Sequence, residues 1–197
     1  MTYLHTRDIN GAEKQMEQDN QSNAILVLKC QRRDEKAFRE IVNSWEPRLY
    51  YYLRRIVENE NDVWDILQET WLAVFKNIRK LEDPLKFSTW LYKISHNKAV
   101  NLLRKENRYV QMKSDQISDN FENTNTDIDV KERGEHVHKL LDKLKLAHRE
   151  IITLYFLEGF SINEMAQIIG VSEGTVKSRL YYAKHKLHEV LKGAKDV

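Results

Sequence analysis

The sequence is poor in the residues that interrupt or cross-link a chain. Its 197 residues include six glycines, two prolines and one cysteine. So few turn-forming residues argue against an all-β protein, because tight turns depend on glycine and proline. The single cysteine, Cys30, cannot form an internal disulfide, which is typical of a reducing compartment. The rest of the composition, 41% hydrophobic and 31% charged, favours helices arranged in one or two domains.

Long apolar runs and groups of metal ligands are lacking as well. No stretch approaches the roughly 18 apolar residues that a membrane span needs, so no membrane insertion is expected. Residues 1–22 are polar and do not resemble a secretory signal, which predicts a cytoplasmic protein. The seven histidines are scattered, and His136 and His138 have no cysteine nearby. Neither a metal nor another cofactor is therefore predicted.

The formal net charge is only +2, which taken alone argues against a nucleic-acid partner. The charge is distributed unevenly, however. Residues 86–110 carry a net charge of +5 and residues 172–197 a net charge of +3, whereas residues 111–135 carry −4. Two basic segments separated by an acidic one are compatible with two nucleic-acid-binding surfaces.

Composition and periodicity divide the chain into four parts. Residues 1–23 are predicted to form a disordered tail. Residues 111–135 are predicted to form a flexible acidic linker, because they hold too few apolar side chains to offset the entropy of ordering. Residues 24–110 and 136–197 carry apolar side chains at three- and four-residue steps. The expected fold is all-α, with two small helical domains joined by the linker.

Two apolar stripes predict the first helices. One covers residues 38–56, and Pro47 is expected to kink or break its helix. The other covers residues 63–78 and includes Phe75. A patch of carboxylates and amides faces away from this second stripe and consists of Asp62, Asp65, Gln68 and Glu69. Such a patch is either solvated or binds a basic protein surface, and periodicity does not decide between the two.

A basic helix is predicted to follow. Residues 80–87 are expected to form a loop, and Ser88 or Thr89 to cap the helix. Opposite its apolar side runs a polar stripe of Lys93, Asn97, Asn101, Arg104 and Arg108. Phe87 and Trp90 lie at its entry, and aromatic rings beside cations suit single-stranded nucleic acid. A solvated stripe with Trp90 in the core is an equally good interpretation.

The second domain contains a helix-turn-helix signature. Ser161 and Glu164 fit a capping box at the start of an apolar run, and Gly170 suits its left-handed end. Ser172 then caps a second helix. Two helices joined by such a short turn are typical of a helix-turn-helix unit.

The second helix of this unit has one apolar and one polar face. The polar face and its flanking cations are Thr175, Lys177, Ser178, Arg179, Tyr181, Tyr182, Lys184 and His185. Such a helix fits the major groove, with cations on phosphates and the central side chains on base edges. A solvated face is the alternative, but the caps, the turn and the cations together favour DNA.

Three motifs, in order, resemble those of bacterial RNA polymerase sigma factors of the sigma-70 family, and especially the extracytoplasmic-function (ECF) group. The motifs are DILQETW at residues 65–71, FSTWLYKISHN at residues 87–97 and GTVKSRL at residues 174–180. The resemblance covers about residues 24–110 and 138–192. It implies a promoter-specificity subunit, not an enzyme, that binds core RNA polymerase and promoter DNA. It also implies a monomer when free and an anti-sigma factor, which can hold the protein at the membrane.

The resemblance implies a role for each candidate surface. A core-docking patch, formed by Asp62, Asp65, Gln68 and Glu69, would bind polymerase. A −10 surface would melt and hold the −10 promoter element through Phe87, Trp90, Lys93, Asn97, Asn101 and Arg104. A −35 surface would read the −35 element through Thr175, Lys177, Ser178, Arg179, Tyr181, Tyr182, Lys184 and His185. Tyr182 stands where relatives often carry arginine, so no −35 sequence is predicted.

A stand-alone helix-turn-helix regulator of duplex DNA is the alternative. It would need a dimer interface, a ligand domain or a phosphoacceptor domain, and residues 24–110 suit none of these. A helical enzyme would need converging ligands or carboxylates. Asp62, Asp65 and Glu69 share a face, but no partner cluster appears elsewhere in the sequence.

Overall fold

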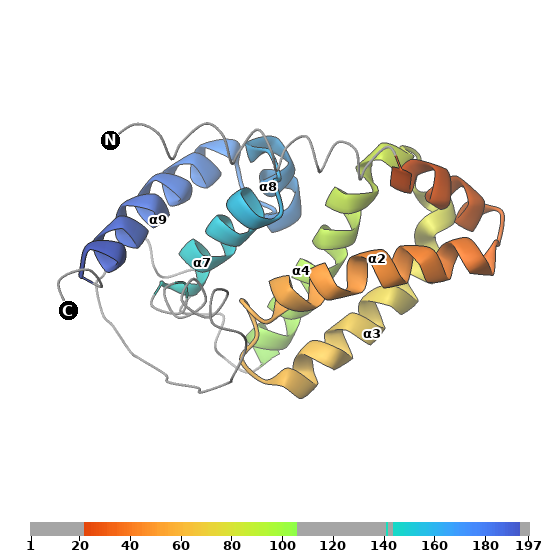
Figure 1. The fold of residues 1–197 in the computed structure, drawn as a ribbon, viewed down its shortest axis with the longest axis horizontal. Helices are drawn as coiled ribbons and strands as arrows, with labels where there is room; N and C mark the ends of the chain where they lie inside the picture. The colour runs from red at the N-terminus through yellow and green to blue at the C-terminus, as the bar shows by residue number, and fades with distance from the viewer. Residues whose placement is uncertain (1–21, 106–140, 142–143, 194–197) are drawn as a thin grey trace.

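A computed structural model describes residues 22–105, 141 and 144–193 (Figure 1). The first half contains a helix over residues 22–31, α2 (Glu35–Leu53), α3 (Glu60–Asn77), the 3₁₀ turns η1 (Ile78–Lys80) and η2 (Pro84–Lys86), and α4 (Phe87–Lys105). The second half contains α7 (Leu146–Ile152), the π-helical turn η3 (Thr153–Leu157), α8 (Ile162–Ile169) and α9 (Glu173–Gly193). These elements confirm the all-α prediction. The predicted linker, and the predicted tail except for its last two residues, lie outside the described residues.

The helix α2 runs through a proline. It begins after Asp34, whose carboxylate accepts two backbone N–H groups of the first turn. Pro47 lies inside the helix, so the predicted break at this residue is wrong. Trp45 before the proline and Leu49 after it are both buried in the core. Their burial outweighs the one backbone hydrogen bond that proline removes.

The start of α4 differs from the prediction. The segment predicted as a loop contains η2 and the last residue of η1, and α4 continues from η2 at Phe87. Asp83 caps η2 by accepting the Leu85 N–H at 3.0 Å, and Pro84 follows as the first residue of the turn. Ser88 and Thr89 are therefore buried inside the helical run rather than acting as caps.

The helix-turn-helix unit is confirmed in detail. The Ser161 hydroxyl accepts the Glu164 N–H, and the Glu164 carboxylate accepts the Ser161 N–H at 2.9 Å, which completes the capping box. Gly170 ends α8 with a φ of 75°. Val176 and Leu180 form the buried face of α9, as its apolar stripe predicts.

Alanine at Gly170 is expected to lower the free energy of unfolding by about 1–2 kcal/mol, because a Cβ is strained in the left-handed region. No neighbouring atom lies within 4 Å of the added carbon, so the backbone alone accounts for the loss. Gly174→Ala is the matched control. Its Cβ meets only Ser172 Oγ at 3.7 Å, and it should stabilise the protein by about 0.4–1 kcal/mol. Urea unfolding of both variants measures the change in the free energy of unfolding. Equal changes in the two variants would contradict the left-handed conformation assigned to Gly170.

The two halves pack against each other. Figure 1 shows α4 between the α2–α3 pair and the helices of the second half, and α8 lies against α4. Tyr92 of α4 packs edge-to-face on Phe160, which precedes α8, with 4.8 Å between ring centroids. Buried apolar residues of both halves form one continuous core. No helix among the described residues is long and apolar enough to cross a membrane.

Candidate nucleic-acid and protein interfaces

The core-docking patch lies along the outer side of α3. Asp65, Gln68 and Glu69 are exposed there. Asp62, in the first turn, is partly buried. Glu69 Oε2 accepts a hydrogen bond from Lys98 Nζ of α4 at 2.8 Å, and this bond and the lysine charge lower the pKa of the Glu69 carboxyl. The predicted residues therefore share a face, on which Glu69 is oriented by α4.

Two large apolar side chains extend this face, which the sequence did not predict. Leu72 is 58% exposed and Phe75 is 63% exposed. The assignment of Phe75 to the buried stripe is wrong, since its ring packs edge-to-face on Phe38 of α2 and otherwise meets solvent. Successive residues of a helix are about 100° apart, so Phe75 is turned away from the core-facing position that its neighbour Val74 occupies.

The polar stripe of the −10 surface is exposed along α4, as predicted. Lys93, Asn97, Asn101 and Arg104 all face outward. Arg108 lies outside the described residues. Phe87 does not join the stripe: it is 1% exposed and packs edge-on against Trp45 in the core. Its ring is therefore not available to stack on a base, and its role is to anchor the start of α4.

A pocket of about 530 Å³ opens beside this stripe, between the end of α3, the two 3₁₀ turns and α4. Trp90 lines one wall, with its ring partly buried. Lys80 and Lys86 line the same pocket together with Asn77 and the carboxylates of Glu82 and Asp83, and Lys86 Nζ lies 3.7 Å from Asp83 Oδ2. An aromatic wall with hydrogen-bonding groups around it suits an unstacked base.

The −35 surface has an exposed centre and partly buried flanks. Exposed side chains of α9 are Lys177, Ser178, Tyr181, Tyr182 and His185, and partly buried ones are Thr175, Arg179 and Lys184. Tyr181 and Tyr182 are 67% and 61% exposed and pack edge-to-face on each other. Lys184 Nζ lies 5.0 Å from the Tyr155 ring centroid of η3, and burial lowers its pKa. This lysine therefore fixes α9 on η3 as well as adding charge.

The described residues contain no group of three His, Cys, Asp or Glu side chains arranged to hold a metal ion.

Family models match both halves of the chain: Sigma-70 region 2 matches residues 41–109, and Sigma-70 region 4 matches residues 135–187. An ECF RNA polymerase sigma-E factor of Haemophilus influenzae is 30% identical over 182 residues, covering 84% of this chain and 93% of that protein. The chain belongs to the ECF group of the sigma-70 family.

Other sigma factors agree with this assignment. SigW, an ECF sigma factor of Bacillus subtilis, is 25% identical over 84% of this chain and 95% of its own length. CnrH, solved in complex with the cytosolic domain of CnrY, has a TM-score of 0.62 and 26% identity, covering 87% of this chain and 97% of CnrH. The sigma factor RpoE of Bartonella quintana, solved with the anti-sigma factor NepR, has a TM-score of 0.62 and 27% identity. The match covers 80% of this chain and 98% of RpoE. This sigma factor is thus a transcription initiation factor, and a stand-alone regulator is not favoured.

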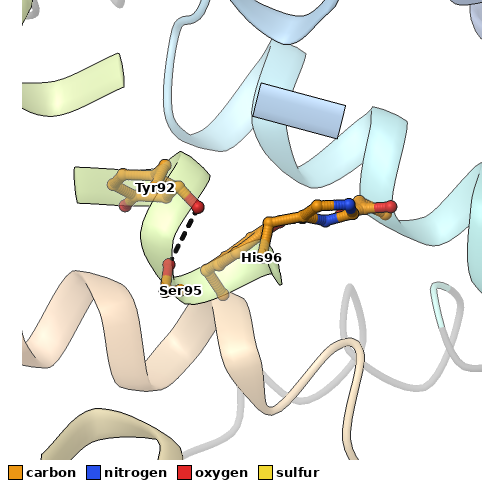
Figure 2. A network of polar contacts seen from close by, with 5 residues as sticks. Tyr92, Ser95 and His96 are labelled. Atoms are coloured by element: carbon orange, nitrogen blue, oxygen red, sulfur yellow. Dashed lines mark hydrogen bonds and ion pairs between the residues drawn. The ribbon is translucent and has the colours of Figure 1, made fainter. Parts of the chain in front are cut away.

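A buried polar seam joins the two halves of the sigma factor, and sequence reasoning missed it. Glu150 of α7 is fully buried, and its Oε1 lies 2.7 Å from His96 Nδ1 of α4. The same oxygen accepts the Tyr52 hydroxyl of α2 at 2.7 Å. Figure 2 shows Tyr92, Ser95 and His96 on one stretch of α4, with the His96 ring turned toward the cyan second half.

A second group of contacts extends the seam. Glu158 Oε2, at the end of η3, accepts the Tyr92 hydroxyl at 2.7 Å and Arg48 Nε at 3.1 Å. Glu164 Oε1 of α8 accepts the Thr89 hydroxyl at 3.2 Å. Three glutamates of the second half therefore bond to α2 and α4. The one signal in the sequence was that Glu150 and Glu158 flank an apolar run, which does not reveal their partners.

Proposed function

We propose that this sigma factor directs core RNA polymerase to promoters through three surfaces, without enzymatic activity of its own. The core-docking patch on α3 binds polymerase, the −10 surface with its pocket opens and holds the −10 element, and the −35 surface reads duplex DNA. The observation that carries the proposal is that the described parts of the two basic segments form separate exposed surfaces, one beside the pocket that Trp90 lines and one on a helix-turn-helix.

The pocket beside α4 supports strand opening. Lys93, Asn97, Asn101 and Arg104 form a line of cations and amides that can follow one phosphate backbone. Trp90 at the pocket wall can stack on a base that has left the duplex. Stacking tolerates any base, so selectivity falls to the polar groups that line the pocket.

The −35 surface supports duplex reading. The first turns of α9 place Ser178, Tyr181 and Tyr182 outward, with Lys177 beside them for phosphate contact. A tyrosine contacts a thymine methyl or a phosphate but cannot make the bidentate bond to guanine that arginine makes. We therefore propose that this sigma factor does not read guanine through residue 182.

The double substitution Gln68→Ala with Glu69→Ala is expected to weaken binding to core polymerase by about tenfold. A hydrogen bond to a charged group contributes about 1.5–3 kcal/mol, and a pair that is partly solvated contributes less than this. Fluorescence anisotropy of labelled sigma factor titrated with core polymerase measures the affinity. The control is Lys36→Ala with Glu40→Ala, which removes two exposed side chains of α2. Unchanged affinity in the Gln68 and Glu69 variant, with the control also unchanged, would refute the docking role.

A further inference from the structure

The end of the helix over residues 22–31 is tied to the turn that follows α3. Gln31 Nε2 donates hydrogen bonds to the backbone oxygens of Ile78, at 3.0 Å, and Leu81, at 2.8 Å. Ile78 begins η1 and Leu81 follows it, so one side chain holds the turn at both ends. Figure 1 shows the red helix beside the yellow-green segment that ends α3. Two segments that are far apart in the sequence therefore lie next to each other.

This contact brings together four exposed cations. Arg32 and Arg33 follow Gln31 directly, and Arg79 and Lys80 lie between the two carbonyls that Gln31 bonds. These four side chains are called the turn cluster here. Residues 29–36 and residues 76–86 each contain four cations and two carboxylates, so the two segments together carry a net charge of +4. The sequence hides this charge, because residues 24–85 taken as a whole are neutral.

The cations of the turn cluster are not neutralised by the protein. None of the four forms an ion pair with another residue in the part of the chain that the structure describes. Two nearby carboxylates are engaged in their own elements, since Asp34 caps α2 and Asp83 caps η2. Cations elsewhere are paired, as Arg39 is with Glu35, Lys98 with Glu69 and Lys177 with Glu173. Cations that are held together without partners attract anions.

Arg33 has a backbone conformation that glycine adopts at lower cost. Its φ is 69°, and it is the only residue other than glycine with a positive φ among those described. The Arg33 N–H donates to the Cys30 oxygen at 2.9 Å, which ends the helix and turns the chain toward α2. An exposed side chain in this region costs backbone free energy and adds nothing to the core. Such strain is typical of positions that serve a function.

We propose that the turn cluster is a second phosphate-binding surface, which holds the opened promoter strand where it leaves the pocket. The proposal rests on the proposed function, because it needs a strand whose base is held at Trp90. Lys80 and Leu81 line the same pocket as Trp90. A strand with one base in this pocket therefore meets the polar stripe of α4 on one side and the turn cluster on the other.

The chemistry of the turn cluster favours a nucleic-acid backbone over an acidic protein surface. Three of its four members are arginines, whose planar guanidinium groups bind phosphate oxygens through two parallel hydrogen bonds. The cations are spread over two adjacent turns, which suits a row of phosphates better than a single anion. Lys80 makes the cluster continuous with the pocket. The strand that enters the pocket is thus the anion nearest to hand.

The salt dependence of strand binding tests the turn cluster. Sigma factor with core polymerase is titrated into a labelled oligonucleotide, the single non-template strand of a promoter that supports run-off transcription. Each phosphate contact of a single strand contributes about 0.7 to the slope of log affinity against log salt, which is about fivefold in affinity at about 0.1 M. Arg32→Gln with Arg79→Gln should therefore lower the slope by about 1.4 and weaken binding about 25-fold. Wild-type slope and affinity would overturn the proposal.

The matched control removes two cations that lie outside the turn cluster. Arg39→Gln with Lys177→Gln takes one exposed cation from α2 and one from α9, and each of these is paired with a glutamate. This variant should bind the oligonucleotide as the wild type does. An equal loss in the control and in the cluster variant would mean that any cation serves, which contradicts a specific surface.

Arg33→Gly separates binding from stability. Its loss of one phosphate contact should weaken strand binding about fivefold. Its urea midpoint should be equal to or above that of the wild type, because glycine relieves the left-handed strain. Weaker binding then cannot result from unfolding. Wild-type binding would remove Arg33 from the surface, and a lower midpoint would contradict the strain assigned to it.

Shortening the oligonucleotide tests where the turn cluster acts. The effect of Arg32→Gln with Arg79→Gln should disappear when nucleotides are removed from one end. The effect of Lys93→Gln, on the stripe of α4, should disappear when they are removed from the other end. Equal effects on oligonucleotides of every length would overturn the placement of the two surfaces on either side of the pocket.

The outcomes also separate the turn cluster from the proposed function. If the wild-type complex initiates at promoters and binds the strand, but the cluster variants bind it equally well, the turn cluster is wrong and the function stands. If the wild-type complex neither initiates nor binds the strand, the proposed function fails. If the cluster variants lose affinity for core polymerase itself, the cluster faces an acidic protein surface and the proposal is overturned.

Discussion

Replacing Trp45 with alanine is expected to cost about 3–5 kcal/mol of the free energy of unfolding, the range for a buried aromatic side chain. Trp45 is 1% exposed and packs edge-to-face on Phe87 and Tyr92. The Arg48 guanidinium lies 4.6 Å from its ring centroid, so the loss would also loosen the side chain that bonds Glu158. Because domains of this size are stable by about 5–15 kcal/mol, this loss removes a large share of the free energy of unfolding. Urea titration followed by circular dichroism measures the loss.

Trp64→Ala is the control for this prediction. Trp64 lies on the surface of α3, is 43% exposed and stacks on Tyr50 at 4.9 Å between ring centroids. Its removal should cost about 1 kcal/mol, the value of an aromatic pair at the surface. If both tryptophan variants lost the same stability, Trp45 would not be the centre of the core.

Replacing Trp90 with alanine is expected to reduce opening of a duplex promoter by about 10- to 100-fold, because stacking of a base on an aromatic ring contributes about 1–3 kcal/mol. Trp90 lines the pocket beside α4 and rests on Phe87, with 6.2 Å between ring centroids. Permanganate reactivity of thymines in the −10 element, in the presence of core polymerase, reports the fraction of open promoter. Trp90→Phe keeps a ring and should recover most of the activity.

Leu85→Ala controls for damage to the loop. Leu85 belongs to η2, is 51% exposed and does not line the pocket. Its replacement should leave both promoter opening and core binding unchanged. If Trp90→Ala opened the promoter as well as the wild type does, the pocket wall would not hold a base. If Trp90→Ala also lost binding to core polymerase, its defect in opening would not arise at the pocket.

Features governed by near neighbours could be predicted from the sequence. The capping box of Ser161 and Glu164, the left-handed Gly170 and the buried face of α9 each depend on residues a few positions apart. The exposed stripe of α4 follows from periodicity in the same way. These features contain the whole helix-turn-helix and most of the −10 surface, so the candidate sites follow largely from local pattern.

Features governed by distant contacts could not be predicted. Pro47 stays within α2 because the surrounding side chains are buried, and Phe87 is in the core because Trp45 lies against it. The seam is the clearest case. His96 and Glu150 are 54 positions apart, and no local pattern pairs them. The sequence therefore indicated two domains with a linker, whereas the structure shows their faces in contact.

Run-off transcription tests the central claim most directly. Purified sigma factor is combined with core RNA polymerase and a set of promoter fragments, and transcripts are measured with and without each component. The account predicts transcripts of defined length that require the sigma factor, core polymerase and particular −10 and −35 sequences together. Tight DNA binding by the protein alone, with no sequence-dependent initiation on any promoter, would contradict it.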